Sequence, residues 1–81
     1  MYDQWFHSIR INDLPGVRKH ISKGINPFET RNNQTARQMV KGYITKLSRM
    51  KHKDHIRVYM YKQMHALLVE AEQGHDEKSY L

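Results

Sequence analysis

Histidine and carboxylate side chains are the groups in this sequence that could bind a metal ion or transfer a proton. His52 and His55 lie three residues apart, where a loop is expected to give way to a helix. Lys51 and Lys53 flank His52, and their positive charge opposes the binding of a divalent cation. Because a metal site needs several convergent ligands, we interpret this segment as a polar loop.

Catalytic nucleophiles are equally poorly supported. Ser22 and Ser48 have no base at a recognisable spacing, and the sequence contains no cysteine. Asp3, Asp13 and Asp54 each stand where a helix is expected to begin, and this position is typical of a capping residue. We therefore expect a protein that is not an enzyme and that uses neither a metal ion nor another cofactor.

Two short amphipathic helices are predicted near the start of the chain. The apolar residues at helical spacing are Tyr2, Trp5, Phe6 and Ile9 in the first stretch, and Leu14, Val17 and Ile21 in the second. Asn12 tolerates the left-handed backbone of a tight turn, and Asp13 can cap the helix that follows. So short a turn predicts an antiparallel pair, the second helix ending at Gly24.

A change of pattern follows this pair. Residues 25–34 are rich in turn-forming residues and have no helical period, which predicts an extended loop or a hairpin. Thr35 and Gln38 then fit a capping box, in which each side chain bonds a backbone N–H at the start of a helix. A third helix is expected to begin there.

Three of these segments share their motifs with a known repeat. Residues 11–14 (Ile-Asn-Asp-Leu) and the following Val17 are similar to a helix-turn-helix junction of the form Asn-Gly-Asp-Leu plus Val. Residues 20–26 are similar to a helix exit of the form Leu-Leu-x-x-Gly-Ala-Asp, and residues 33–38 stand where the repeat has Gly-x-Thr-Pro-Leu-His. On these motifs the chain resembles the ankyrin repeat over about residues 4–44.

The resemblance implies a helix pair, a projecting finger and the first helix of a second unit. This finger is one residue shorter than the family's and lacks the glycine at its tip, and Gln38 replaces the histidine that normally bonds back to the loop. Ankyrin proteins present their finger tips and first helices as a concave recognition surface. The resemblance therefore implies that this chain binds another macromolecule through the same elements.

Two longer helices are predicted in the rest of the chain. Their apolar stripes are Ala36, Met39, Val40, Tyr43, Ile44, Leu47 and Met50 in the first, and Ile56, Met60, Met64, Leu67, Leu68 and Ala71 in the second. Asp54 can cap the last helix, which is expected to end at Gly74. The predicted fold is all-α, with one domain over residues 1–74 and a polar tail over residues 75–81.

Length and composition restrict the class of protein further. A chain of 81 residues has a small core, and two repeat units rarely bury enough apolar surface alone. The long helices could act as a cap, the chain could self-associate, or a target could cover the exposed faces. The absence of cysteine and of an apolar run or leader fits a cytoplasmic protein without a membrane partner.

The charge is strongly uneven. The formal net charge is +6, and between residues 37 and 62 the acidic residue Asp54 stands alone against eight basic residues. These are Arg37, Lys41, Lys46, Arg49, Lys51, Lys53, Arg57 and Lys62. Such a surface attracts phosphate groups or an acidic protein face, and nearby Tyr43, Tyr59 and Tyr61 could stack on nucleobases. The simpler alternative to a binding surface is that these basic residues form a solvated helix face and that the tyrosines close the core.

We expect a binding module with a protein partner, for example a small inhibitor or adaptor such as a phage-encoded protein that blocks a host factor. The predicted partner-binding residues are Phe28, Glu29, Arg31, Asn32, Arg37, Lys41 and Arg49. Phe28 could instead pack under the finger. The alternative is a nucleic-acid-binding regulator, and its predicted polyanion-binding residues are Lys46, Lys51, Lys53, Arg57 and Lys62.

Overall fold

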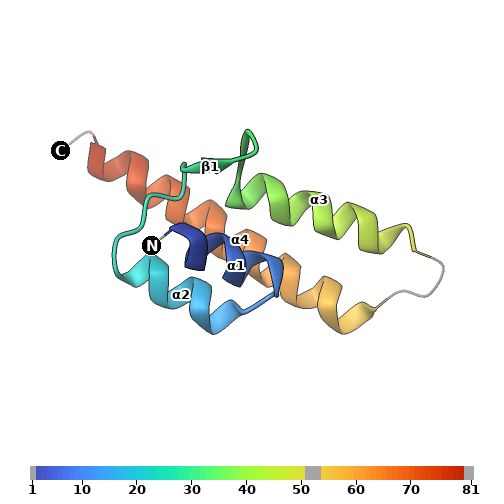
Figure 1. Cartoon of the computed structure of the whole chain (residues 1–81). Helices are drawn as coiled ribbons and strands as arrows, with labels where there is room; N and C mark the ends of the chain where they lie inside the picture. The colour runs from blue at the N-terminus through green and yellow to red at the C-terminus, as the bar shows by residue number, and fades with distance from the viewer. Residues whose placement is uncertain (1, 51–53, 80–81) are drawn as a thin grey trace.

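The computed structural model describes residues 2–50 and 54–79, with side chains through His75. Within these ranges the chain forms four α-helices and one hairpin (Figure 1). The helices are α1 (Tyr2–Arg10), α2 (Leu14–Ser22), α3 (Ala36–Ser48) and α4 (His55–Ser79), and the strands are β1 (Thr30–Arg31) and β2 (Gln34–Thr35). The predominantly helical fold agrees with the prediction from the sequence.

The turn between α1 and α2 has the predicted local structure. Asn12 has a φ of 61°, in the left-handed region, and the Asp13 carboxylate accepts a hydrogen bond of 3.1 Å from the N–H of Gly16. A Cβ atom at Gly16 would collide with that carboxylate, so a larger residue here would displace the capping side chain. Gly24, with a φ of 85°, follows the last turn of α2 as expected.

The segment between α2 and α3 is a hairpin. Thr30 pairs with Thr35 and Arg31 with Gln34, and both residues of the turn, Asn32 and Asn33, have positive φ angles of 54° and 65°. These angles belong to a type I′ turn, which matches the natural twist of two antiparallel strands. Asparagine tolerates this conformation, so the turn forms without the glycine found at the ankyrin tip.

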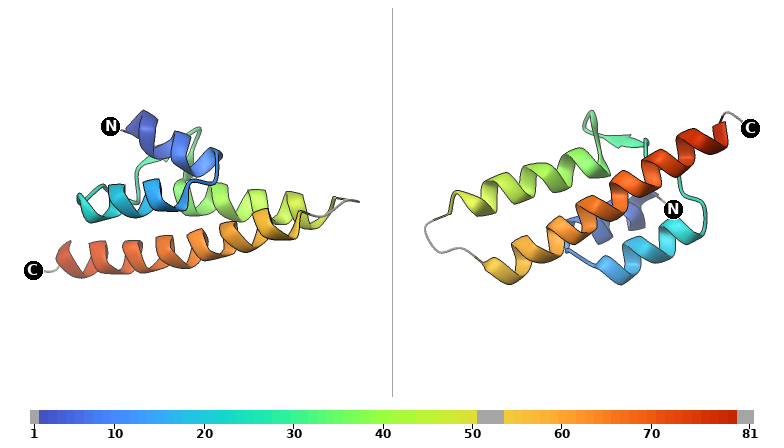
Figure 2. Two further views of the ribbon diagram at one scale, coloured as in Figure 1. Left: turned by 90° about the horizontal axis from the view of Figure 1, so that it is seen from below. Right: turned by 180° about the vertical axis from the view of Figure 1, so that it is seen from behind.

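Three layers build the core. Figure 2 shows α2 and α3 lying along α4, with α1 on the side of α2 and α3 that faces away from α4. The largest fully buried side chains come from all four helices: Trp5 and Ile9 from α1, Val17 from α2, Val40 from α3, and Met64 and Leu68 from α4. Each helix thus contributes its predicted apolar stripe to one cluster.

The stripes of the long helices are shorter than predicted. Met50 is 48% exposed and Ile56 is 75% exposed, although both continue the apolar stripes of their helices in the sequence. The end of α3 and the start of α4 extend beyond α1 and α2 (Figure 1). Met50 follows the end of α3 and Ile56 is the second residue of α4, where the third layer does not reach. Tyr61, in contrast, is 4% exposed and belongs to the core.

Two helix boundaries also differ from the prediction. Asp3 was expected to cap α1, but the helix already includes Tyr2, and the Asp3 carboxylate pairs with Arg31 of the hairpin. The last helix was expected to end at Gly74, but α4 continues to Ser79. The Phe28 ring packs on the His75 ring at 5.7 Å, so tertiary contact supports the turn after Gly74. The division between a domain and a tail at residue 75 stays a prediction.

The cap of α3 is fully formed. The Thr35 hydroxyl accepts from the N–H of Gln38 at 3.3 Å, and the Gln38 side-chain oxygen accepts from the N–H of Thr35 at 2.9 Å. These two bonds satisfy donors that the helix itself cannot pair. The start of α3 therefore depends on Thr35.

Replacing Thr35 with alanine is expected to lower the free energy of unfolding by about 1 kcal/mol, because the N-cap is lost. Thr45→Ala is the matched control, since Thr45 is exposed in the middle of the same helix and alanine favours helix there. Urea denaturation of both variants measures the difference. Equal losses in the two variants would contradict the importance of this cap.

Candidate interaction surface

A groove lies where α1 crosses α3 beneath the hairpin. Its volume is about 550 Å³, and its lining is Asp3, Gln4, Phe6, His7, Arg10, Arg31, Asn32, Met39 and Tyr43. We call it the α1–α3 groove. Phe6 is buried and Met39 and Tyr43 are half-buried, whereas the other lining residues are exposed. The groove therefore has an apolar floor and a polar rim.

Arg31 fixes the hairpin to α1. Its guanidinium pairs with the Asp3 carboxylate and lies 4.9 Å from the centre of the Phe6 ring. A cation over an aromatic face is attracted by the ring electrons. The Asp3 side chain is 92% exposed, so the ion pair contributes little and the contact of Arg31 with the Phe6 ring is the main link between this wall of the groove and α1. Arg31 was predicted as a partner contact, and in the structure it also has this positioning role.

A second depression opens at the end of α1. It is lined by Arg10, Tyr43, Lys46, Leu47, Met50, Arg57 and Tyr61, and we call it the helix-end depression. It shares Arg10 and Tyr43 with the α1–α3 groove, and a smaller hollow over Met39, Tyr43 and Lys46 also adjoins both. The α1–α3 groove and the helix-end depression therefore form one continuous surface along α3.

Uncharged contacts hold the helices together around this depression. The Tyr61 hydroxyl donates a hydrogen bond of 2.9 Å to the carbonyl of Arg10, and the Asn12 amide donates one of 3.2 Å to the carbonyl of Arg57. The rings of Tyr43 and Tyr61 pack at 5.3 Å between centres with a tilt of 35°. These contacts link α4 both to α3 and to the end of α1.

The environment of Tyr61 favours its neutral form. Burial raises the pKa of its hydroxyl above 10.0, the nearby Tyr43 adds to the rise, and Arg57 opposes it. The hydroxyl therefore keeps its proton and remains a hydrogen-bond donor to Arg10 through the whole neutral range.

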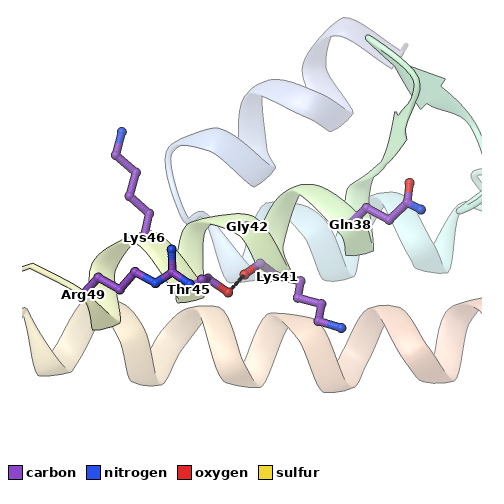
Figure 3. A pocket seen from close by; sticks show the side chains of 6 residues that line it. All are labelled: Gln38, Lys41, Gly42, Thr45, Lys46 and Arg49. Carbon is purple, nitrogen blue, oxygen red and sulfur yellow. Dashed lines mark hydrogen bonds between the residues drawn. The ribbon is translucent and has the colours of Figure 1, made fainter.

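A third surface lies on the outer face of α3. It is lined by Gln38, Lys41, Gly42, Thr45, Lys46 and Arg49 (Figure 3), and the Thr45 hydroxyl donates to the Lys41 carbonyl at 3.0 Å. Lys46 and Lys41 point to opposite sides of α3 (Figure 3). Lys46 is on the side of the helix-end depression and lines it as well. Helix α3 contains no acidic residue, which makes this face strongly cationic.

Gly42 leaves a gap at the centre of that face. A Cβ atom built on it would meet nothing within 4 Å, so no contact inside the described chain requires glycine there. Glycine in a helix interior costs about 0.5–1 kcal/mol relative to alanine. Without a Cβ atom, the backbone of α3 at Gly42 is open to close approach by another molecule.

The predicted partner-binding residues do not form one patch. Arg31 and Asn32 line the α1–α3 groove, whereas Lys41 and Arg49 lie on the outer face of α3. Glu29 is exposed but lines neither surface.

Two members of that set are turned toward the chain itself. The Arg37 guanidinium donates to Glu72 of α4 at 2.8 Å, and the Glu72 side chain is 14% exposed. Phe28 is 37% exposed and packs on His75, so the structure favours packing at the core edge over a free anchor. Both side chains keep about a third of their surface exposed, so their role as partner contacts stays a prediction.

The predicted polyanion-binding residues are also divided. Lys46 and Arg57 meet in the helix-end depression, and Lys62 is exposed on α4 outside it. Lys51 and Lys53 lie outside the described residues, as does His52 of the histidine pair.

The tyrosines expected to stack on nucleobases are mostly used in packing. Tyr61 is buried and Tyr43 is half-buried against it, whereas Tyr59 is 63% exposed. Of the two alternatives left open by the sequence, burial of Tyr61 therefore favours closure of the core over stacking. Within the ranges that the structure covers, no cluster of three or more histidine and carboxylate side chains could hold a metal ion. No helix in these ranges has the length and apolar character to cross a membrane.

Sequence reasoning missed the residues that α1 contributes. Gln4, His7 and Arg10 recur every third residue outside the apolar stripe of α1, and all three line the groove together with Phe6 of that stripe. This polar row on a first helix was the available signal. These residues line the groove together with Met39 and Tyr43 only because α1 crosses over α3. No local sequence pattern predicts that crossing.

Alanine at Gly42 is expected to raise the free energy of unfolding by about 0.5–1 kcal/mol, because it favours the helix and meets no clash. Gly74→Ala, in α4 and also free of clashes, is the matched control and should stabilise by a similar amount. Thermal denaturation measures both. A fall in stability for Gly42→Ala alone would show that the space above Gly42 is occupied.

Replacing Tyr61 with phenylalanine is expected to lower the free energy of unfolding by about 1 kcal/mol at neutral pH, since the bond to Arg10 is lost. The parent should also lose stability as the pH rises above 10.0, because the unfolded tyrosine releases its proton before the folded one does. Tyr61→Phe should show a smaller loss over that range. Identical pH profiles of denaturation for the two proteins would contradict the raised pKa.

Comparisons of the chain with models of protein families, with curated proteins and with solved structures found no match. The surfaces described above are the basis on which a function is proposed.

Proposed function

We propose that this protein is a non-enzymatic binding module, a small inhibitor or adaptor, whose α1–α3 groove holds a segment of a protein partner. The observation that carries the proposal is the groove itself, with its apolar floor and polar rim formed by α1, the hairpin and α3. The resemblance to the ankyrin repeat supports the same location, because it assigns recognition to the finger and the first helices.

The composition of the groove suits a protein partner. Protein interfaces are enriched in tyrosine, methionine and arginine at their centres, and Tyr43, Met39 and Arg10 are the corresponding side chains here. Methionine is flexible and polarisable, so Met39 can adapt to the shape of an apolar side chain. Arg31 is already held by Asp3 and Phe6, and the hairpin wall therefore needs little ordering on binding.

The charge of the surface favours an acidic partner. Lys46 lies beside the groove on a helix without acidic residues, and Arg10 lies on the rim. Complementary charge accelerates the encounter of two proteins and excludes partners of the same sign. A partner whose binding segment carries aspartate or glutamate is therefore favoured over a neutral one.

A nucleic-acid partner is the second candidate, favoured by the basic residues between 37 and 62. Its contact set would extend over Lys46, Arg57 and Lys62, since phosphate binding draws on every cation near the strand. The packed ring of Tyr61 argues against base stacking at that position. Nucleic-acid binding would weaken steeply with added salt, whereas a protein interface with an apolar centre responds mildly.

Charge reversal at Lys46 should separate the two candidates. The immobilised protein is used to capture partners from a nuclease-treated lysate of its source cells, with Lys46→Glu and Lys62→Glu as matched variants. Both lysines are exposed and each variant changes the charge equally, but Lys46 alone of the two lines the hollows that adjoin the α1–α3 groove. We expect Lys46→Glu to weaken capture of the same protein at least about tenfold, and Lys62→Glu to leave it nearly unchanged.

Two results would contradict the proposal. Capture that is lost in the treated lysate but present in an untreated one, and that both variants weaken equally there, would favour nucleic acid. Undiminished capture by Lys46→Glu, with both variants folded as judged by circular dichroism, would place the protein interface away from the groove.

A further inference from the structure

Three cations from three helices meet at the helix-end depression. Arg10 comes from the end of α1, Lys46 from α3 and Arg57 from the first turns of α4. Among the residues that the structure describes, no carboxylate lines the depression. The nearest described acidic contact is that of Asp54 with Arg57 at 4.0 Å, and both side chains of this pair are more than half exposed. The positive charge of the depression is therefore poorly neutralised by the chain itself.

The hydrogen bonds that hold the helices together around the depression do not use these charges. The backbone carbonyls of Arg10 and Arg57 accept the hydrogen bonds from Tyr61 and Asn12, and the side-chain charges take no part in these contacts. The Arg10 guanidinium contacts the His7 ring of its own helix at 3.3 Å. Like charges near one another repel, so an anion bound among them would relieve an unfavourable arrangement.

Apolar groups lie directly beside the cations. Leu47 and the half-buried ring of Tyr43 line the same depression, and Met50 is 48% exposed there. The volume is about 290 Å³, at the lower limit of small-molecule sites, which span about 300–1,000 Å³. A ligand that fits both halves carries an anionic group next to an apolar one and is no larger than a few side chains.

We propose that the helix-end depression binds an acidic residue of the partner segment, with an adjacent apolar side chain placed against Met50 and Leu47. This inference rests on the proposed function, because the depression continues the α1–α3 groove through Arg10 and Tyr43. It specifies the partner's chemistry: an aspartate or glutamate beside a residue such as leucine or phenylalanine.

The same observations favour a peptide over a nucleic acid. The cations form one compact group around an aliphatic surface, and Tyr61 lies buried against Tyr43 and presents no open face for a base. A strand of nucleic acid is bound by cations spaced along its backbone and by exposed aromatic faces. Leu47 and Met50 have no matching role in such a complex.

Short synthetic probes test the proposal on the intact chain. The first probe is the blocked peptide Glu-Glu-Leu-Phe-Glu-Glu, and its controls are Gln-Gln-Leu-Phe-Gln-Gln, Glu-Glu-Ala-Ala-Glu-Glu and a hexathymidylate. Titrations are followed by amide and side-chain NMR signals of ¹⁵N-labelled protein, which detect millimolar affinities. We expect the first probe to shift the signals of Lys46, Met50 and Arg57, and each control to bind at least about threefold more weakly.

Three single variants locate the bound acid. Arg10→Gln, Lys46→Gln and Arg57→Gln each remove one charge, and each should weaken the first peptide at least about threefold. Lys62→Gln removes a charge from α4 outside the depression and should have no effect. The amide spectrum of each free variant shows whether it is folded.

Several outcomes would overturn the inference. These are tighter binding of the hexathymidylate, equal binding of the glutamine peptide, or equal weakening by Lys62→Gln. Failure of the peptide to bind, with capture of a partner still sensitive to Lys46→Glu, would reject this ligand chemistry and leave the groove proposal intact. Peptide binding as expected, with capture insensitive to Lys46→Glu, would uphold the anion site and reject the groove as the partner interface.

Discussion

The docking of α1 across α2 and α3 is the contact on which the rest of the structure depends. Trp5 and Ile9 are completely buried in this layer, and burial of each such side chain contributes about 1.5–3 kcal/mol. The same crossing forms the α1–α3 groove and places Arg10 at the helix-end depression. The Tyr61 hydroxyl then fixes the end of α1 through the Arg10 carbonyl. Core packing and the proposed interface therefore share one cause.

Local chemistry explains which features could be predicted from the sequence. Asp13 and Thr35 cap their helices through bonds to residues three positions away, so their roles can be inferred from neighbouring residues alone. The sequence predicted either an extended loop or a hairpin between α2 and α3. The chain forms the hairpin, because Asn32 and Asn33 adopt the positive φ angles that its tight turn requires. These are short-range effects, and the structure confirms them.

Features that depend on distant residues were predicted poorly. Met50 and Ile56 continue their apolar stripes in sequence but extend past the layer that would bury them. The pairing of Arg37 with Glu72 spans 35 positions, so the sequence around Arg37 gives no sign of this contact. Gly74 remains helical because the turn beyond it packs on Phe28. In each case tertiary contact overrides the local pattern.

The methionines offer the most direct measurement of the central claim, that a protein partner occupies the α1–α3 groove. Met39 lies on the floor of the groove and Met50 in the helix-end depression, whereas Met60 and the buried Met64 line neither. With ¹³C-labelled methionine methyl groups, titration of the captured partner should shift the signals of Met39 and Met50 and leave those of Met60 and Met64 in place. A complex that forms with an unchanged Met39 signal would contradict the account.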